Sequence, residues 1–212
     1  QPKIVERMHP GDGTTLPKSV LSFLLAALLW SLASCASSLD MSQEQLAAPG
    51  PEWGIVIGSV LIRQEQKGSS SDTVARDRST MFELDVVQIQ PGDPNGESPY
   101  AARYQVDATA GQDRSFLSRL RPGRYLIKNF YRTGMSGTGG DLNLVFESQS
   151  GRVVYIGQLL VDVPPQLSHG KDYRFSVQDT HDITFSQLAP RHRDLTQQAI
   201  TVPMQFRPDD SH

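Results

Sequence analysis

The densest cluster of side chains that could do chemistry is Asp179-Thr180-His181-Asp182, where an imidazole lies among carboxylates. Such a pair could act as a general base, or bind a metal ion together with further ligands. A metal site needs about three protein ligands at suitable spacing, and the other histidines after residue 35 form no H-x-H or HExxH pattern. These histidines are His169, His192 and His212. We therefore expect no metal and no cofactor, and we interpret the cluster as a turn into a helix, with an aspartate as its cap and His181 exposed; a hydrolase centred on His181 is kept as an alternative.

A glycine-rich stretch, RTGMSGTGGD at 132–141, invites comparison with a phosphate-binding loop. A phosphate loop needs a following helix whose N-terminal amides face the anion, and usually a lysine. Here a β-patterned segment follows and the stretch has no lysine, so we predict a flexible hairpin loop. The chain also has no G-x-S-x-G motif for a nucleophilic serine. The sequence therefore predicts a protein that is not an enzyme.

Four arginines surround a Pro-Gly pair and form the basic run of the chain. They are Arg114, Arg119, Arg121 and Arg124, around Pro122-Gly123. Guanidinium groups on loops bind carboxylates and phosphates, so this run, with Trp53, is our candidate binding surface for an anionic partner such as a peptide carboxylate or a lipid headgroup. The alternative is a solvated rim without a binding role.

The single cysteine, Cys35, follows an apolar run over 20–33 that Lys18 precedes. As a helix this run spans roughly 21 Å, which is shorter than the bilayer core of about 30 Å. A short apolar run behind a basic segment is typical of a cleaved signal peptide. With only one cysteine, the chain can form no internal disulfide.

The run ends in Leu32-Ala33-Ser34-Cys35, which resembles the lipobox of bacterial lipoproteins. The resemblance implies cleavage between Ser34 and Cys35 and lipidation of Cys35 with palmitate-type acyl chains, which hold a protein on a bilayer. Ala36 and Ser37 follow in place of an aspartate, which by the same resemblance implies the outer rather than the inner membrane of the cell envelope. A plain secretory signal with an incidental cysteine is the alternative.

We divide the chain into four parts: a signal peptide at 1–34, the lipidated cysteine with a flexible tether at 35–52, a β-sandwich domain at 53–206 and a disordered tail at 207–212. The tether is small, polar and rich in Pro and Gly. The formal net charge of −3 gives no electrostatic argument for nucleic acid.

From Trp53 on, short segments rich in Val, Ile, Tyr and Phe alternate with turn residues, which predicts a mostly β fold, an antiparallel β-sandwich. Strands are expected near 53–63, 81–90, 102–108, 123–131, 142–148, 152–163, 172–178 and 199–206. Because both faces of 152–163 are apolar, we expect this strand to be central and covered on both sides. Loops are expected at 64–80, 91–101 and 132–141, and one short C-terminal helix should end near Pro190.

The pattern Phe116-Leu117-x-x-Leu120-x-Pro122-Gly123-x-Tyr125 resembles the strand–PG–strand element of transthyretin-like (prealbumin-like) and carboxypeptidase-regulatory-like domains. In such a turn the glycine takes a positive φ. The stretches Val154-Tyr155-Ile156-Gly157 and Tyr173-x-Phe175-x-Val177 resemble parts of small envelope lipoproteins. These resemblances imply a prealbumin-like sandwich on a lipoprotein anchor.

Together these patterns predict a non-enzymatic, membrane-anchored envelope lipoprotein. Its partners would be the bilayer, through acylated Cys35, and another envelope protein. The alternative is a carrier of a small ligand or a carbohydrate, which needs a concave pocket lined by aromatic residues. The aromatics to inspect for that pocket are Trp53, Tyr100, Tyr104 and Tyr131.

Overall fold

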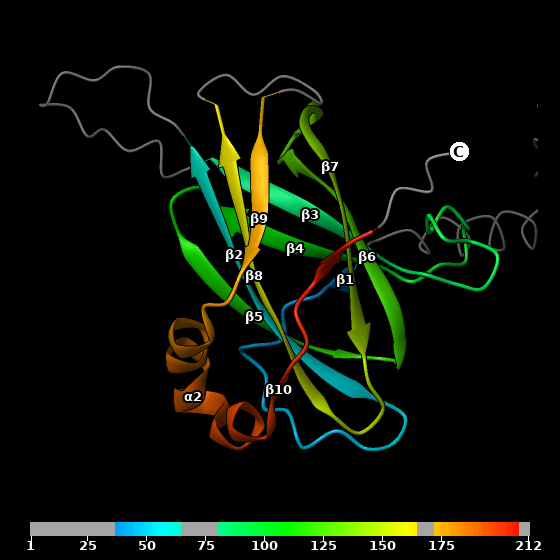
Figure 1. The fold of residues 1–212 in the computed structure, drawn as a ribbon, viewed down its shortest axis with the longest axis vertical. Helices are drawn as coiled ribbons and strands as arrows, with labels where there is room; N and C mark the ends of the chain where they lie inside the picture. Colours follow the sequence, from blue (N-terminus) through cyan, green and yellow to red (C-terminus); the bar gives the residue numbers. More distant parts are fainter. Residues whose placement is uncertain (1–36, 65–79, 165–171, 208–212) are drawn as a thin grey trace, which may run out of the picture. The chain divides into compact units, whose positions relative to one another are not determined.

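The computed structural model describes residues 37–64, 80–164 and 172–207, and these form two β-sheets and one helix (Figure 1). The strands are β1 (Ser37–Ser38), β2 (Gly54–Gln64), β3 (Met81–Gln88), β4 (Arg103–Thr109), β5 (Asp113–Leu120), β6 (Gly123–Arg132), β7 (Met135–Ser148), β8 (Val153–Val163), β9 (Arg174–Gln178), β10 (Ile200–Thr201) and β11 (Gln205–Phe206), and the helix is α2 (His181–Gln198). The predicted signal peptide, the lipobox, His169, His212 and most of the 64–80 loop lie outside the described residues.

The two sheets pack face to face, which confirms the mostly β fold with one C-terminal helix. One sheet has the strand order β1-β4-β3-β6-β7-β11, and the other has the order β10-β8-β2-β5, with β9 also paired to β8. The pairing is mixed rather than purely antiparallel, because β2 and β8 run parallel, as do β1 with β4 and β10 with β8. Between β2 and β8 the chain forms β3 and β4 of the six-stranded sheet, β5 of the five-stranded sheet, and then β6 and β7 of the six-stranded sheet.

Strand β8 is buried on both faces, as its sequence predicted. Val154 and Ile156 pack between the sheets, while Val153 and Tyr155 belong to a second cluster on the outer face. Leu188 and Leu195 of α2 join that outer cluster, so the helix covers the five-stranded sheet (Figure 1). Burying each such side chain contributes about 1.5–3 kcal/mol to the stability of the fold. The outer face of this sheet therefore needs a covering element, and the helix provides it.

The helix is longer than predicted, because it continues past Pro190 to Gln198. The chain absorbs the proline with a kink at His192, whose φ and ψ are −130° and 39°. Thr180, not an aspartate, occupies the N-cap position and makes no capping hydrogen bond. The prediction of an aspartate cap was therefore wrong; Asp182 lies in the first turn, where its charge favours the helix dipole.

Most of the glycine-rich stretch is strand rather than loop, because β7 begins at Met135 and only Thr133 and Gly134 form the turn that joins it to β6. Tyr173 packs against this strand, and a Cβ on Gly140 would lie 2.1 Å from its ring. The Tyr173 hydroxyl donates to the carbonyl of Asp141 at 2.5 Å. Gly140 therefore serves the close packing of an aromatic ring on a strand, where we had expected a flexible loop.

Two further segments differ from the sequence-based expectations. The stretch 113–120, absent from the expected strands, forms β5. The expected strand at 199–206 is two short strands, β10 and β11, in different sheets. Arg207, expected to begin a disordered tail, donates from its backbone N–H to the carbonyl of Asn143 at 3.0 Å.

The segment predicted to be a tether packs on the domain from Ser37 onward. Ser37 pairs with Tyr104 in parallel register, and the Leu39 side chain is only 2% exposed. The N–H of Met41 donates to the carbonyl of Leu117 at 2.7 Å. Leu39 supplies the apolar group that a free polar tether would lack, and burying it draws the segment onto the sandwich.

Replacing Gly140 with alanine tests the packing of Tyr173. Because the new Cβ would overlap the ring, we expect Gly140→Ala to lower the free energy of unfolding by about 1–3 kcal/mol. The matched control is Gly50→Ala, whose Cβ would meet nothing within 4 Å, and we expect it to change stability by less than about 0.5 kcal/mol. Urea unfolding measures both, and equal effects would contradict the assignment of 135–148 to a strand.

Candidate binding site

The basic run of the sequence divides into three places in the fold. Arg114 forms an ion pair with Asp40 at 2.9 Å, so it fixes the N-terminal segment. Arg124 lies on β6 opposite Glu147. Arg119 and Arg121 come together over the ring of Trp53, with their guanidinium carbons 5.2 Å and 5.5 Å from the ring centroid. The fold therefore brings three of the predicted binding residues into one cluster, which we call the Trp–Arg cluster.

A tight corner between the sheets positions Arg121. Arg121 and Pro122 alone connect β5 in one sheet to β6 in the other. Gly123 has a φ of +147°, which confirms the expected positive φ. The hydroxyl of buried Tyr125 donates to the carbonyl of Arg121 at 2.9 Å, which ties the corner to the core. The corner backbone is therefore fixed, and the Arg121 side chain extends from a rigid base.

Trp53 is held by backbone hydrogen bonds just before β2. Its carbonyl accepts from the N–H of Gly151 at 2.9 Å, and its N–H donates to the carbonyl of Gly50 at 3.1 Å. The next residue, Gly54, packs so closely that a Cβ there would lie 2.4 Å from the carbonyl oxygen of Gln149. The indole is therefore presented by a fixed backbone, half-buried at the surface.

The electrostatics of the Trp–Arg cluster favour an anion. In the described part of the chain, Arg119 and Arg121 form no ion pair, and both side chains are exposed. Burial raises the pKa of Tyr104 and of Tyr125, while nearby Arg121 opposes both shifts, so its charge lies within electrostatic reach of both phenols. Arginine can stack on an aromatic ring and still direct its N–H groups at a carboxylate or phosphate. The arrangement can therefore bind an anionic group without moving an ion pair aside.

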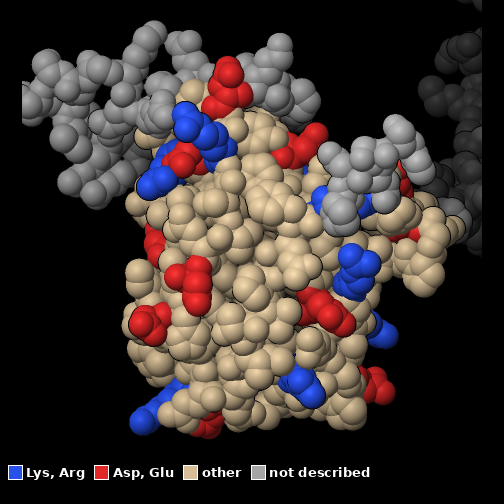
Figure 2. All heavy atoms as spheres, in the orientation of Figure 1, with Lys and Arg blue, Asp and Glu red and all other residues tan. Residues whose placement is uncertain are grey.

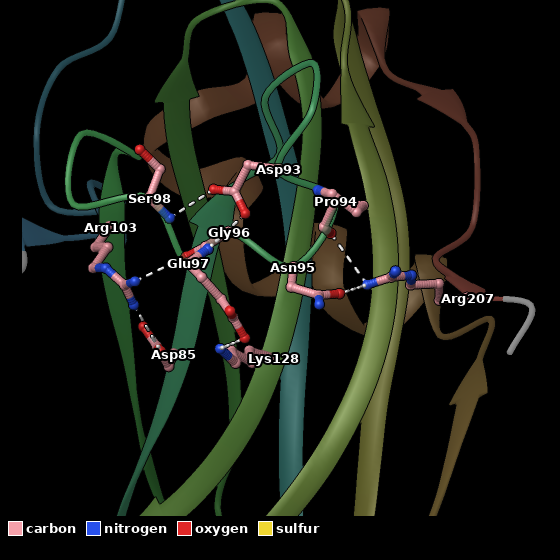
Figure 3. A network of polar contacts seen from close by, with 10 residues as sticks. All are labelled: Asp85, Asp93, Pro94, Asn95, Gly96, Glu97, Ser98, Arg103, Lys128 and Arg207. Carbon is pink, nitrogen blue, oxygen red and sulfur yellow. Dashed lines mark hydrogen bonds and ion pairs between the residues drawn. The ribbon is translucent and has the colours of Figure 1, made fainter. Parts of the chain in front are cut away.

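The loop between β3 and β4 lies next to the corner and is held by a network of polar contacts (Figure 3). The Asp93 carboxylate accepts from the N–H groups of Glu97 at 2.9 Å and Ser98 at 2.7 Å, and these bonds lower its pKa. Arg103 donates to the carbonyl of Gly96 at 2.8 Å, and Arg207 donates to Asn95 Oδ1 at 2.6 Å. The loop therefore has a defined shape.

The four aromatic residues singled out in the sequence lie on different elements of the described structure. Tyr100 is 88% exposed in the β3–β4 loop, whereas Tyr104 packs its ring 6.2 Å from that of Tyr125. Tyr131 lies on β6, where burial and a hydrogen bond with Glu83 raise its pKa to about 12. Two grooves of about 470 and 440 Å³ flank the kink of α2 in the described structure, and neither is lined by Phe, Tyr or Trp. These grooves do not match the aromatic-lined pocket of a carbohydrate carrier.

The residues at 179–182 lead into the helix α2, which agrees with the interpretation of this cluster as a turn into a helix. His181 Nδ1 lies 3.2 Å from Asp182 Oδ1, and its ring stands over Tyr155 and Phe185. The His181 side chain is 44% exposed, and Asp182 is fully exposed. Neither the hydrogen bonds nor the ring contacts of His181 in the described residues include a Ser, Thr or Cys nucleophile, and no group of three metal-ligating side chains gathers in those residues.

His192 is the residue that sequence reasoning missed. It is only 4% exposed, and its Nε2 donates to the carbonyl of Ser42 at 2.8 Å. Its spacing from Leu188 and Leu195, four and three residues away, places the three on one helical face, and this signal could have found it. His192 thus has a structural role, because it joins the helix to the N-terminal segment, and it also lines both grooves beside the kink.

The face of the molecule in Figure 2 carries Lys and Arg side chains interspersed with Asp and Glu around a broad uncharged area. This face presents no electrostatic field of a single sign.

None of the helical structure in the described ranges is long and apolar enough to cross a bilayer. No family model, curated protein or solved structure matches the chain.

Removing the hydroxyl of Tyr125 tests the corner. We expect Tyr125→Phe to lower the free energy of unfolding by about 1 kcal/mol, because the carbonyl of Arg121 loses its donor. Tyr100→Phe is the matched control, since this exposed hydroxyl makes no hydrogen bond in the described structure, and its effect should stay below about 0.5 kcal/mol. Chemical denaturation compares the two; a neutral Tyr125→Phe would refute the role of this hydrogen bond.

Alkaline pH tests the buried phenols. Tyrosines of the unfolded chain ionise near pH 10, whereas the folded state raises the pKa of Tyr131 to about 12 and also raises that of Tyr125. A phenol whose pKa is higher in the folded state than in the unfolded state stabilises the fold. This stabilisation is fully present below about pH 10 and is lost as the pH rises toward about 12. We expect unfolding midpoints in urea to fall over this window, and to fall less in Tyr131→Phe. A wild-type profile without that fall would count against the assignment.

Proposed function

We propose that this chain is a membrane-anchored envelope lipoprotein that acts as a non-enzymatic binding or assembly module. Cys35 would carry the lipid, and the sandwich would bind an anionic group of another envelope component. The observation that carries the proposal is the Trp–Arg cluster: Arg119 and Arg121 converge on Trp53 and have no carboxylate partner in the described structure.

The convergence supports binding because two like charges on one ring repel each other. A cation over an indole gains about 0.5–1 kcal/mol at an exposed site, and like charges in water lose part of that gain. An incoming carboxylate or phosphate could lie between both guanidinium groups, offset part of their mutual repulsion and accept several of their N–H bonds. The fixed backbones of Trp53 and Arg121 add to this, because a preorganised site loses less conformational entropy on binding.

The proposed location in the cell envelope rests on the lipobox-like residues that end at Cys35. The proposed structural relationship to known β-sandwich families rests on the corner between β5 and β6. The corner joins strands of two sheets through Pro122-Gly123 and is fastened by Tyr125, which supports a transthyretin-like or carboxypeptidase-regulatory-like relationship. The outer membrane is the proposed location, since Ala36 and Ser37 follow the cysteine.

A carrier of a small polar ligand is the second candidate, favoured by the larger groove beside α2. Its volume of about 470 Å³ falls in the range of ligand sites, and side chains of both charges line it. Asp113 and Gln187 contribute from β5 and α2, and Arg191 lies at the kink. This groove would suit a ligand that carries both signs of charge.

Affinity purification from mildly cross-linked envelopes tests the proposal, with the double variant Arg119→Gln/Arg121→Gln and with Cys35→Ser. We expect a stoichiometric partner, either an envelope protein or an anionic lipid, that each change weakens, and palmitate labelling that only Cys35→Ser abolishes. The matched control is Arg132→Gln/Arg174→Gln, which removes the same charge elsewhere. Labelled palmitate on the Cys35→Ser protein would refute the anchor, and a protein that purifies without a partner would favour the small-ligand carrier.

A further inference from the structure

The strand registers place many elements at one end of the sandwich. Strands β2, β4, β6 and β8 begin at this end, and β3, β5 and β7 end there. Pairs such as Gly54 with Leu120 and Gly123 with Ser148 fix the alignment, and the two-residue link at Arg121 and Pro122 joins the two sheets there. We call this the corner end.

The corner end carries a group of exposed arginines around the half-buried Trp53. Its arginines beyond the Trp–Arg cluster include Arg124 and Arg152, which are both exposed and form no ion pair in the described structure. The carboxylates of the β3–β4 loop are already engaged: Asp93 by backbone N–H groups, and Glu97 by Lys128 at 3.9 Å. The positive charge of this end therefore comes from arginines that form no ion pair in the described structure, although Glu147 lies opposite Arg124 in the strand register.

The first paired strand also begins at the corner end. Ser37 pairs with Tyr104, next to the start of β4 at Arg103. Cys35 precedes Ser37 by two residues, and two residues of chain span at most about 7 Å. Because the segment from Ser37 packs on the domain, the chain would join a lipid on Cys35 to this end of the sandwich through one intervening residue, Ala36.

We propose that the corner end lies against the bilayer that holds the Cys35 lipid, with Arg119 and Arg121 bound to the phosphates of anionic headgroups and Trp53 at the interface. This inference rests on the lipid anchor of the proposed function and names the occupant of its binding site. The lipid would hold the domain on the membrane, and the Trp–Arg cluster would fix which end faces it.

The chemistry of the cluster fits a headgroup layer. A phosphate accepts paired hydrogen bonds from a guanidinium, and an indole places its apolar body toward the acyl chains while its N–H stays at the polar level. Anionic lipid contributes about fivefold in binding for each arginine near the surface. Two arginines therefore favour this orientation by about 30-fold over one that turns the cluster away.

The fluorescence of Trp53 reads the orientation directly, because Trp30 would leave with the signal peptide and Trp53 is the other of the two tryptophans. The lipidated chain is reconstituted in phosphatidylcholine vesicles with and without phosphatidylglycerol. We expect lipids brominated on their acyl chains to quench Trp53, and acrylamide to lose access, when phosphatidylglycerol is present. Arg119→Gln/Arg121→Gln should shift this equilibrium about 30-fold toward exposure, whereas Arg132→Gln/Arg174→Gln, at the opposite end, should not.

The outcomes separate the orientation from the anchor. If the protein floats with vesicles while acrylamide reaches Trp53 as readily as in detergent, the orientation is refuted and the anchor stands. If Cys35→Ser floats as the lipidated chain does, the anchor is refuted. Protection of Trp53 by inorganic phosphate alone would indicate a soluble anion as the ligand, and protection that needs an added envelope protein would indicate a protein partner; either result overturns the headgroup assignment.

Discussion

The fold depends on a central pair of strands, β2 and β8, that are apolar on both faces. One face is buried by the second sheet, and the other would face water unless another element covered it. The helix α2 meets that requirement through Leu188 and Leu195. His192, buried on the same helix, holds the carbonyl of Ser42, so covering the sheet also fixes the N-terminal segment. One hydrophobic constraint thus determines where the helix lies and where the chain enters the domain.

Much of this architecture could be predicted, because alternation and turn residues are local signals. The apolar side chains on both faces of 152–163 predicted a strand that is covered on both sides. The Pro122-Gly123 pair likewise predicted the turn at the corner. The parallel pairing of β2 with β8 was not, because a strand's own pattern does not reveal its partner. Gly140 was misread for a similar reason: its small size serves Tyr173, which lies in a different part of the sequence.

The sequence named the residues of the candidate site but did not predict how the fold arranges them. Proximity in sequence grouped Arg114 with the other arginines, although alternation along β5 and its length separate Arg114 from the corner. The convergence of Arg119 and Arg121 on Trp53 arises from the antiparallel pairing of β5 with β2, a long-range contact. The Trp–Arg cluster is therefore a product of the fold, whereas the lipobox resemblance is a property of a few adjacent residues.

The parallel β2–β8 pair also constrains the order in which this chain can fold. Ile55 meets Val153 across that pair, and every strand of the six-stranded sheet from β3 to β7 lies between them in the chain. A polypeptide that emerges from a ribosome or a translocation pore in the N-to-C direction cannot complete its central sheet until β8 has followed. Contacts this distant in sequence slow folding and leave apolar strands unpaired meanwhile. The domain therefore acquires its core late, after most of its length has been released, and the chain depends on protection from aggregation during that interval.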